Sequence, residues 1–206
     1  MLCQFTVKNF KSIRDEVTFD MQAAAISEHE DRIIIDKDEE KYLPVSVIYG
    51  PNGGGKSNVL AALYTLVAKV LRPLFATEDS EEKVLLQKKI IVEPFAFSVS
   101  KDEPTEFELF FRTTVSEYRY ILHVKRDIVL YESLDRVKLE TGRKSALFTR
   151  DENDIILKGA FAKLKVSDEL SKTLTLLSYL GIAYKGNAVV KDVLSWFEYG
   201  IEFLNY

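Results

Sequence analysis

The sequence predicts an α/β fold in which a glycine-rich loop lies between a strand and a helix, followed by an antiparallel β-region and then by further helices. Three observations predict this order. A glycine-rich octapeptide at 50–57 follows an apolar run and precedes a helical pattern. Hydrophobic residues alternate with a period of two from 94 to 134, and leucines recur three or four residues apart after 167. The change of period separates a β-rich part of the chain from a helical one.

The N-terminal residues 2–21 are predicted to form two strands joined by a tight turn. Phe5, Val7 and Phe10 would share one face of the first strand, and the alternation resumes at Val17. Residues 28–41 are highly charged. We therefore expect an exposed excursion between the strand pair and the glycine-rich loop.

This excursion contains a short apolar island, residues 33–35, followed by Asp36. The arrangement imitates the strand and terminal carboxylate with which many ATPases hold Mg²⁺. However, the island precedes the glycine-rich loop and no other feature supports that role. We interpret Asp36 as an ordinary strand end.

The glycine-rich octapeptide has the surroundings of a phosphate-binding loop. The apolar run 43–49 predicts a buried strand before it, and a helix is predicted from Asn58 to about Leu71, before Pro73. The octapeptide fits the pattern G-x-x-x-x-G-K-[ST]. Its residues are Gly50, Pro51, Asn52, Gly53, Gly54, Gly55, Lys56 and Ser57. We therefore predict that the chain binds a nucleoside triphosphate.

Each residue type in this loop suits the chemistry of a triphosphate. Glycines let the backbone curl around the β-phosphate and point successive N–H groups inward. The N-terminus of the following helix adds partial positive charge. We expect Lys56 to reach the β- and γ-phosphates as the catalytic cation, Ser57 to offer its hydroxyl to Mg²⁺, and Asn58 to complete the cofactor-binding set. Backbone angles that a Cβ would penalise are expected at Gly50, Gly53 and Gly55.

Composition places the chain among ordinary globular proteins. Of 206 residues, 47% are hydrophobic and 29% are charged, and no apolar run reaches the length of a membrane-spanning helix. The net charge of −4 argues against general binding of nucleic acid by charge alone. One cysteine, Cys3, excludes an internal disulfide and fits a reducing cytoplasm, where we expect it to be a small apolar filler.

Later elements follow from hydrophobic period and capping residues. We expect strands over 95–99, 107–111, 118–124, 128–134, 145–149 and 154–157. Ser80 would cap a short helix over 81–88. Ser167 would cap a leucine-spaced helix that ends at Gly181, and a last helix over 189–197 would end near Gly200. We divide the chain into a β-rich nucleotide-binding lobe, 1–160, and a helical segment, 161–206.

Residues 5–13, F-T-V-K-N-F-K-S-I, and the stretch 47–63 around the phosphate loop together resemble the opening of ABC-type ATPases of the RecF and SMC kind. Within that group the chain is most similar to bacterial AAA-type ATP-binding proteins of abortive-infection and phage-defence systems. The resemblance covers residues 1–66. It implies the first lobe of an ABC-type P-loop NTPase head, with ATP and Mg²⁺ as cofactors. It also implies that Lys11 and Ser12 contact ATP, for which a basic surface turn is the alternative.

Members of the resembled family carry further motifs after the first lobe. These are a signature sequence, an acidic Walker B pair, a switch histidine and a glutamine that contacts Mg²⁺. Residues 177–181 faintly echo the signature, but their leucine spacing favours a helix core, and Gln87 lies in a charged helical stretch. We therefore expect an N-terminal fragment of a longer ATPase, which binds ATP without efficient turnover on its own.

The resemblance also implies partners. In the complete protein, ATP would be sandwiched between the two heads of a homodimer, and engagement would control a nuclease or toxin partner or act on DNA, away from membranes. Two alternatives stay open. One is a non-catalytic, nucleotide-regulated protein-interaction module, and the other is a small-molecule P-loop kinase, which would release ADP only when its acceptor is present.

Overall fold

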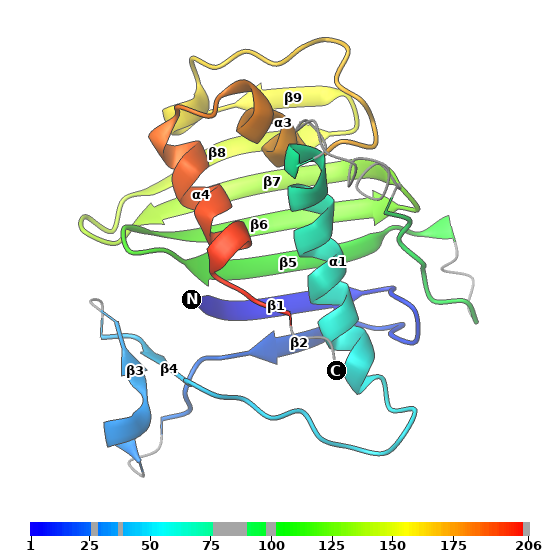
Figure 1. The fold of residues 1–206 in the computed structure, drawn as a ribbon, viewed down its shortest axis with the longest axis vertical. Helices are drawn as coiled ribbons and strands as arrows, with labels where there is room; N and C mark the ends of the chain where they lie inside the picture. Colours follow the sequence, from blue (N-terminus) through cyan, green and yellow to red (C-terminus); the bar gives the residue numbers. More distant parts are fainter. Residues whose placement is uncertain (26–28, 37–38, 76–89, 98–101, 204–206) are drawn as a thin grey trace.

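The computed structural model describes residues 1–25, 29–36, 39–75, 90–97 and 102–203. Its largest element is an antiparallel sheet of seven strands in the order β2-β1-β5-β6-β7-β8-β9 (Figure 1). The strands are β1 (Leu2–Lys8), β2 (Val17–Asp20), β5 (Thr105–Arg112), β6 (Ser116–Lys125), β7 (Ile128–Lys138), β8 (Lys144–Asp151) and β9 (Asp154–Leu157). The helix expected over 81–88 with its cap Ser80, and Gln87 within it, lie outside the described residues.

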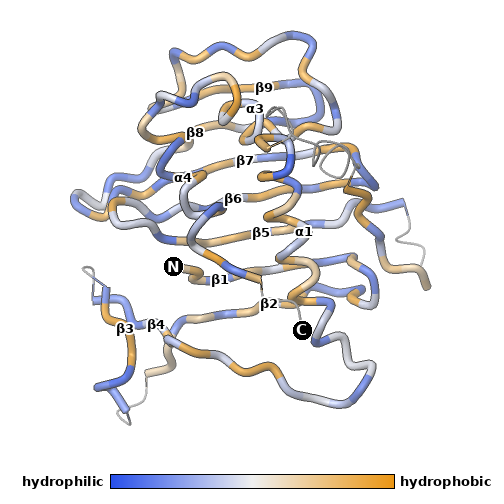
Figure 2. The backbone as a smooth tube through the Cα atoms, viewed as in Figure 1, coloured by the Kyte–Doolittle hydropathy of each residue, from blue (hydrophilic) through white to orange (hydrophobic). Residues whose placement is uncertain are grey.

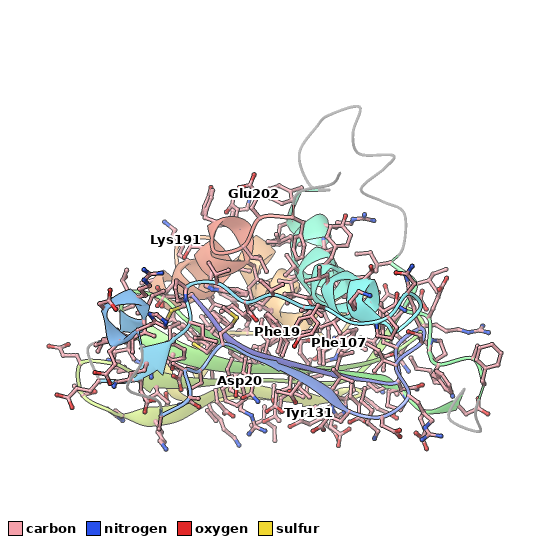
Figure 3. The ribbon with its side chains drawn as sticks, turned by 90° about the horizontal axis from the view of Figure 1, so that it is seen from below. Phe19, Asp20, Phe107, Tyr131, Lys191 and Glu202 are labelled. Atoms are coloured by element: carbon pink, nitrogen blue, oxygen red, sulfur yellow. The ribbon has the colours of Figure 1, made fainter. Side chains whose placement is uncertain are left out.

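Three helices pack on one face of this sheet: α1 (Lys56–Phe75), α3 (Leu176–Ala183) and α4 (Ala188–Tyr199). Figure 3 shows them on one side, while side chains such as Tyr131 extend from the opposite face. The prediction of an α/β fold with an antiparallel β-region and C-terminal helices is confirmed. Short 3-10 helices lie in the connections, among them η1 (Glu30–Arg32) and η3 (Gly159–Phe161).

The core forms between the helices and the inward side chains of the central strands. In β5 and β6 every second residue is buried, as the alternation predicted. The helices contribute the other half of the core through the apolar stripe of each. Fully buried members include Phe5, Val7, Phe107, Leu109, Phe111, Tyr120, Leu122, Leu66, Val70, Leu180, Val193 and Phe197.

A bulge changes which side of β7 faces the core. The pairing register of β6 and β7 shifts between His123 and Val124. A bulge inserts one residue and so exchanges the two faces of a strand. Val129 is consequently buried, whereas Ile128, which the sequence pattern assigned to the core, is 39% exposed.

The strand expected over 95–99 is wrong for its described part. Val92 forms a single bridge with Arg126, and the chain then turns at 96–97. Phe97 is 91% exposed. A strand forms only where a neighbour supplies a continuous row of hydrogen bonds. The described part of this stretch makes isolated bonds instead, to Arg126 and to residues 9 and 11 of the N-terminal bend.

Helix α1 continues through Pro73 to Phe75, four residues beyond the predicted end. Packing explains the extension, because a Cβ on Gly181 of α3 would lie 2.7 Å from Leu74, so glycine lets the last turn of α1 dock there. By length and composition alone α1 could cross a membrane. In this structure α1 packs on the sheet, with Lys69 buried and donating to Asp127 O at 2.7 Å.

Helix α3 begins at Leu176 with Thr175 as its N-cap, not at Ser167 as predicted. The reason lies in the sheet. The buried carboxylate of Glu132 accepts the N–H groups of Leu176 at 2.5 Å and Leu177 at 2.9 Å. These are donors that a helix start leaves unpaired. Residues 177–181 are therefore part of this buried helix, as their leucine spacing predicted.

A small hairpin of β3 (Ile34–Ile35) and β4 (Lys41–Tyr42) stands beside the sheet (Figure 1). It is the exposed excursion that the sequence predicted. Asp36 ends β3 and pairs with Arg112 of β5 at 2.7 Å. The interpretation of Asp36 as a strand end is confirmed, because its carboxylate anchors the hairpin to the sheet. Cys3, behind the hairpin, is a buried filler whose pKa burial raises to about 11.

Candidate nucleotide site

The candidate site begins with a tight bend at the end of β1. Phe10 and Ile13 exchange both backbone hydrogen bonds, at 2.8 and 2.7 Å. Asn9 and Lys11 adopt left-handed backbone angles, with φ of 56° and 49°. Asparagine tolerates this region better than most residues. The chain therefore reverses within a few residues and brings Ser12 to the surface.

The side chain of Asn9 fixes this bend to a distant part of the chain. Its amide nitrogen donates to the carbonyls of Glu103 and Pro104 at 3.0 and 3.1 Å, and its oxygen accepts from Phe95 N at 3.0 Å. Thr105 donates its hydroxyl to Asn9 O at 2.6 Å. Asn9 is 1% exposed. Because unpaired buried polar groups are costly, these contacts hold the bend in one conformation.

The phosphate loop has the backbone that its glycines predict. Gly53 and Gly55 have φ of 78° and 83°, a region that a Cβ penalises. Gly50, with φ of 159°, is close to extended backbone. Gly54 N bonds to Pro51 O at 3.2 Å within the turn. Helix α1 follows directly, starting at Lys56 as the motif requires.

The ammonium group of Lys56 lies over the loop. Nζ donates to the carbonyls of Gly50 and Pro51, each at 2.7 Å. Both acceptors are exposed residues of the loop itself. A lysine held by two neutral carbonyls can exchange them for anionic oxygens without moving its backbone. The prediction that Lys56 reaches phosphate is compatible with this position.

The bend and the phosphate loop lie in contact, although they are more than forty residues apart in sequence. Asn58 of α1 donates its side-chain amide to Ser12 Oγ at 2.6 Å. A Cβ built on Gly55 would lie 3.3 Å from the same oxygen. The site thus joins Ser12, Gly55 and Asn58, three residues that the sequence assigned to nucleotide binding.

The structure leaves two predicted contacts untested, that of Lys11 with ATP and that of Ser57 with Mg²⁺. Lys11 donates its backbone N–H to Glu93 O at 2.9 Å, and its ammonium lies 5.5 Å from the Phe10 ring centre. Its contact with ATP stays a prediction, as does the binding of Mg²⁺ by the exposed Ser57. Among the described residues, no group of three or more metal-binding side chains comes together.

The segment before the loop is not the buried strand that the sequence predicts. Leu43 N bonds to Met21 O at 2.7 Å, but residues 44–50 have no assigned strand. Val45, Val47 and Tyr49 are 70%, 75% and 90% exposed. In Figure 2 this apolar stretch runs past the edge strand β2 without joining the sheet. The loop is therefore presented on an open surface.

Sequence reasoning missed the residues that hold the bend, namely Glu93, Phe95, Glu103 and Thr105. None of them has a local signal. They lie more than eighty residues from the bend in sequence, and the pairing of β1 with β5 brings Thr105 close to it. That pairing sets Lys8 opposite Glu106, so the start of β5 reaches Asn9.

Comparison with protein families gives a match. Residues 45–204 match the family described as "AAA domain, putative AbiEii toxin, Type IV TA system". The match starts at the exposed segment before the phosphate loop and runs through α4, so it covers most of the chain. Among curated proteins, no match was found.

Proposed function

We propose that residues 50–57 hold the triphosphate of Mg-ATP. The premise is that the chain belongs to this AAA-type P-loop ATPase family, which is linked to abortive infection. The proposal rests chiefly on one observation. The bend at Ser12 contacts the loop at Gly55 and the helix at Asn58. Two sequence-distant segments with phosphate-binding chemistry therefore meet at the N-terminus of one long helix.

The residues present fit the ligand. Backbone N–H groups around Gly53 and Gly55 would donate hydrogen bonds to phosphate oxygens, since these positions take the backbone angles of an anion-binding loop. Lys56 would exchange its carbonyl partners for the β- and γ-phosphates, while Ser12 and Lys11 approach the nucleotide from the bend. Ser57 would hold Mg²⁺, which would neutralise charge on the phosphates.

This lobe forms one part of a composite site. Hydrolysis also needs a group that positions water and a clamp for the developing charge. The exposed apolar segment at Val45 and Val47 supports such an arrangement, because a further part of the ATPase that packs on it would bury both side chains. We infer that residues 1–206 bind ATP without efficient turnover. A second head would complete the site.

In the whole protein, ATP would then favour engagement of two RecF/SMC-like heads in a homodimer. Engagement would control a nuclease or toxin partner, or contact with DNA, in defence against phage in the cytoplasm. The division into a nucleotide-binding lobe, 1–160, and the start of a helical lobe, 161–206, belongs to the same proposal.

Substitution Lys56→Ala tests the phosphate site. We expect ATP binding, measured by titration calorimetry with Mg²⁺ present, to weaken roughly a hundredfold, because charge-assisted bonds to phosphate are lost. The thermal unfolding midpoint should not change, since the Lys56 bonds are exposed. Lys191→Ala is the matched control, because Lys191 lies on the outer surface of α4 (Figure 3).

Unchanged ATP affinity in Lys56→Ala would contradict the phosphate-site assignment. The same preparations test the composite site. Negligible phosphate release is expected from the wild-type chain despite ATP binding. Substantial release that Lys56→Ala abolishes would contradict the composite site while leaving the phosphate site intact.

A further inference from the structure

A cavity of about 590 Å³ lies between the β3–β4 hairpin and the C-terminal half of α4, away from the phosphate loop. Ile34 and Ile35 line it from the hairpin, and Trp196, Tyr199 and Gly200 line it from the helix. Its volume is within the usual range of ligand pockets. Neither the phosphate loop nor the bend contributes to it, so the proposed ATP site leaves this cavity without a role.

The walls of the cavity carry exposed apolar side chains. Ile34, Ile35 and Tyr199 are 41%, 57% and 79% exposed. Scattered single residues of this kind are common on surfaces, but a group around one hollow marks an interaction site. The cavity therefore favours a ligand with apolar groups.

Among the described residues, β3 pairs on one side alone, so the hairpin adds an open strand edge to the same cavity. Asp36 N bonds to Glu40 O at 2.9 Å, and Ile34 pairs with Tyr42. Hydrogen-bonded pairs alternate along an antiparallel ladder, so the N–H and C=O of Ile35 point away from β4. Tyr42 of β4 lines a different cavity, with Cys3 and Gln4. The outward edge of β3 therefore belongs to the cavity beside α4.

Trp196 supplies an unused donor. The residue is 3% exposed and stacks on Phe111 at 4.5 Å between ring centres. Within the described part of the chain, its buried Nε1 has no hydrogen-bond partner. Gly200 lies against the neighbouring Cδ1, because a Cβ built there would be only 2.6 Å from it. A small shift of this glycine would let a carbonyl oxygen of a bound ligand reach Nε1. Pairing a buried donor is favourable.

The two carboxylates that line the cavity already accept hydrogen bonds within the protein. Asp36 pairs with Arg112 at 2.7 Å, and Asp192 accepts hydroxyl groups from Thr113 at 3.0 Å and Tyr118 at 2.7 Å. An anionic ligand would meet two carboxylates. A neutral ligand that offers both carbonyl and N–H groups matches the strand edge and the indole donor together.

We propose that this cavity binds an extended, uncharged, apolar segment of a partner protein, which adds as a strand to the outer edge of β3. Its backbone would pair with Ile35, one carbonyl would reach Trp196 Nε1, and an apolar side chain would lie between Ile35 and Tyr199. Strand addition of this kind takes affinity from main-chain hydrogen bonds and specificity from pockets beside the edge.

Trp196 is the only tryptophan of the chain, so its fluorescence reports on the cavity directly. The probe is a capped pentapeptide of alternating valine and threonine, titrated into the full chain. A saturable change of Trp196 emission is expected. The control is the same peptide with alternate amides N-methylated, which cannot pair as a strand and should bind at least roughly tenfold more weakly.

Two variants connect binding to this place. Ile35→Pro removes the outward N–H but keeps the hairpin bonds made by its neighbours, and should weaken binding roughly tenfold. Tyr199→Ala should weaken it by a similar factor. Phe97→Ala is the matched control for an exposed aromatic residue elsewhere and should have no effect. Lys56→Ala should also leave peptide binding unchanged, which separates this proposal from the ATP site.

Equal binding of the methylated and unmethylated peptides would overturn the proposal, as would full affinity in Tyr199→Ala. Absence of any emission change up to the solubility limit of the peptide would also overturn it. If the protein self-associates and Ile35→Pro abolishes this self-association, the occupant of the cavity is a second copy of the chain. The proposal of a partner protein is then wrong.

Discussion

Residues 118–124 of β6 and residues 45–49 before the phosphate loop both alternate apolar side chains, yet their environments are opposite. Tyr118, Tyr120 and Leu122 are fully buried, because β6 lies between β5 and β7. Val45 and Val47 are 70% and 75% exposed, and no strand is assigned around them. The same local pattern therefore gives a strand only where neighbours pair with it. Strand propensity describes how well side chains fit the surface of a sheet, and the neighbouring strands of that sheet must come from other parts of the chain.

The largest effect is expected at Asn9, where the sheet meets the site. Asn9→Ala removes three buried hydrogen-bond partners and places alanine at a φ of 56°. We expect a loss of about 3 kcal/mol in the free energy of unfolding, measured by chemical denaturation. ATP binding should weaken as well, because Ser12 loses its fixed position. Asn153→Ala, at an exposed turn, is the control. A loss below about 1 kcal/mol would show that the bend holds without this anchor.

A matched pair of substitutions measures the contrast directly. Val124→Thr buries a hydroxyl in β6, where Val124 is 1% exposed, and should cost about 2 kcal/mol. Val47→Thr makes the same change at a 75% exposed residue and should stay within about 0.5 kcal/mol. Both are measured by denaturation of the purified chain. Similar costs at the two positions would mean that residues 45–49 are already buried in solution.

The smallest expected effect is the contribution of the buried Glu132 to the pH dependence of the free energy of unfolding. Burial raises the pKa of this carboxyl above its ordinary value of 4.5, although hydrogen bonds from Leu177, Leu176 and Tyr120 act in the opposite direction. The folded state therefore holds the proton more tightly than the unfolded state does. The resulting stabilisation is complete below the unfolded pKa and is lost as pH rises through the folded pKa.

Glu132→Gln isolates this contribution, because glutamine does not titrate. The stability of the wild type relative to Glu132→Gln should fall as pH rises from about 4 towards neutrality. Thermal unfolding of both proteins across that range measures it. A relative stability that rises with pH would mean that the hydrogen bonds outweigh burial at this carboxyl.

Much of the fold could be predicted because it depends on local pattern. The alternation in β5 and β6 gave the correct buried face, and α4 ends at Gly200, near which the sequence predicted the end of its last helix. The bulge after His123 could not be predicted, because it depends on the register between two strands. The start of α3 depends on the carboxylate of Glu132, more than forty residues earlier. The loop glycines could be predicted from the motif, but the anchor at Asn9 depends on strand pairing across the chain.

The pairing of β1 with β5 also has a consequence for the order of assembly. Strands β5 to β9 follow one another in sequence, so each can form a hairpin with its predecessor as the chain lengthens. β1 can form a hairpin with β2 at once, but its pairing with β5 must wait for residues about a hundred positions later, since Phe5 pairs with Leu109. Long closures are slow compared with hairpins. We therefore expect a newly made chain to complete its meander first and to close the bend at Asn9 last, so that the ability to hold a nucleotide arises only after the sheet has formed.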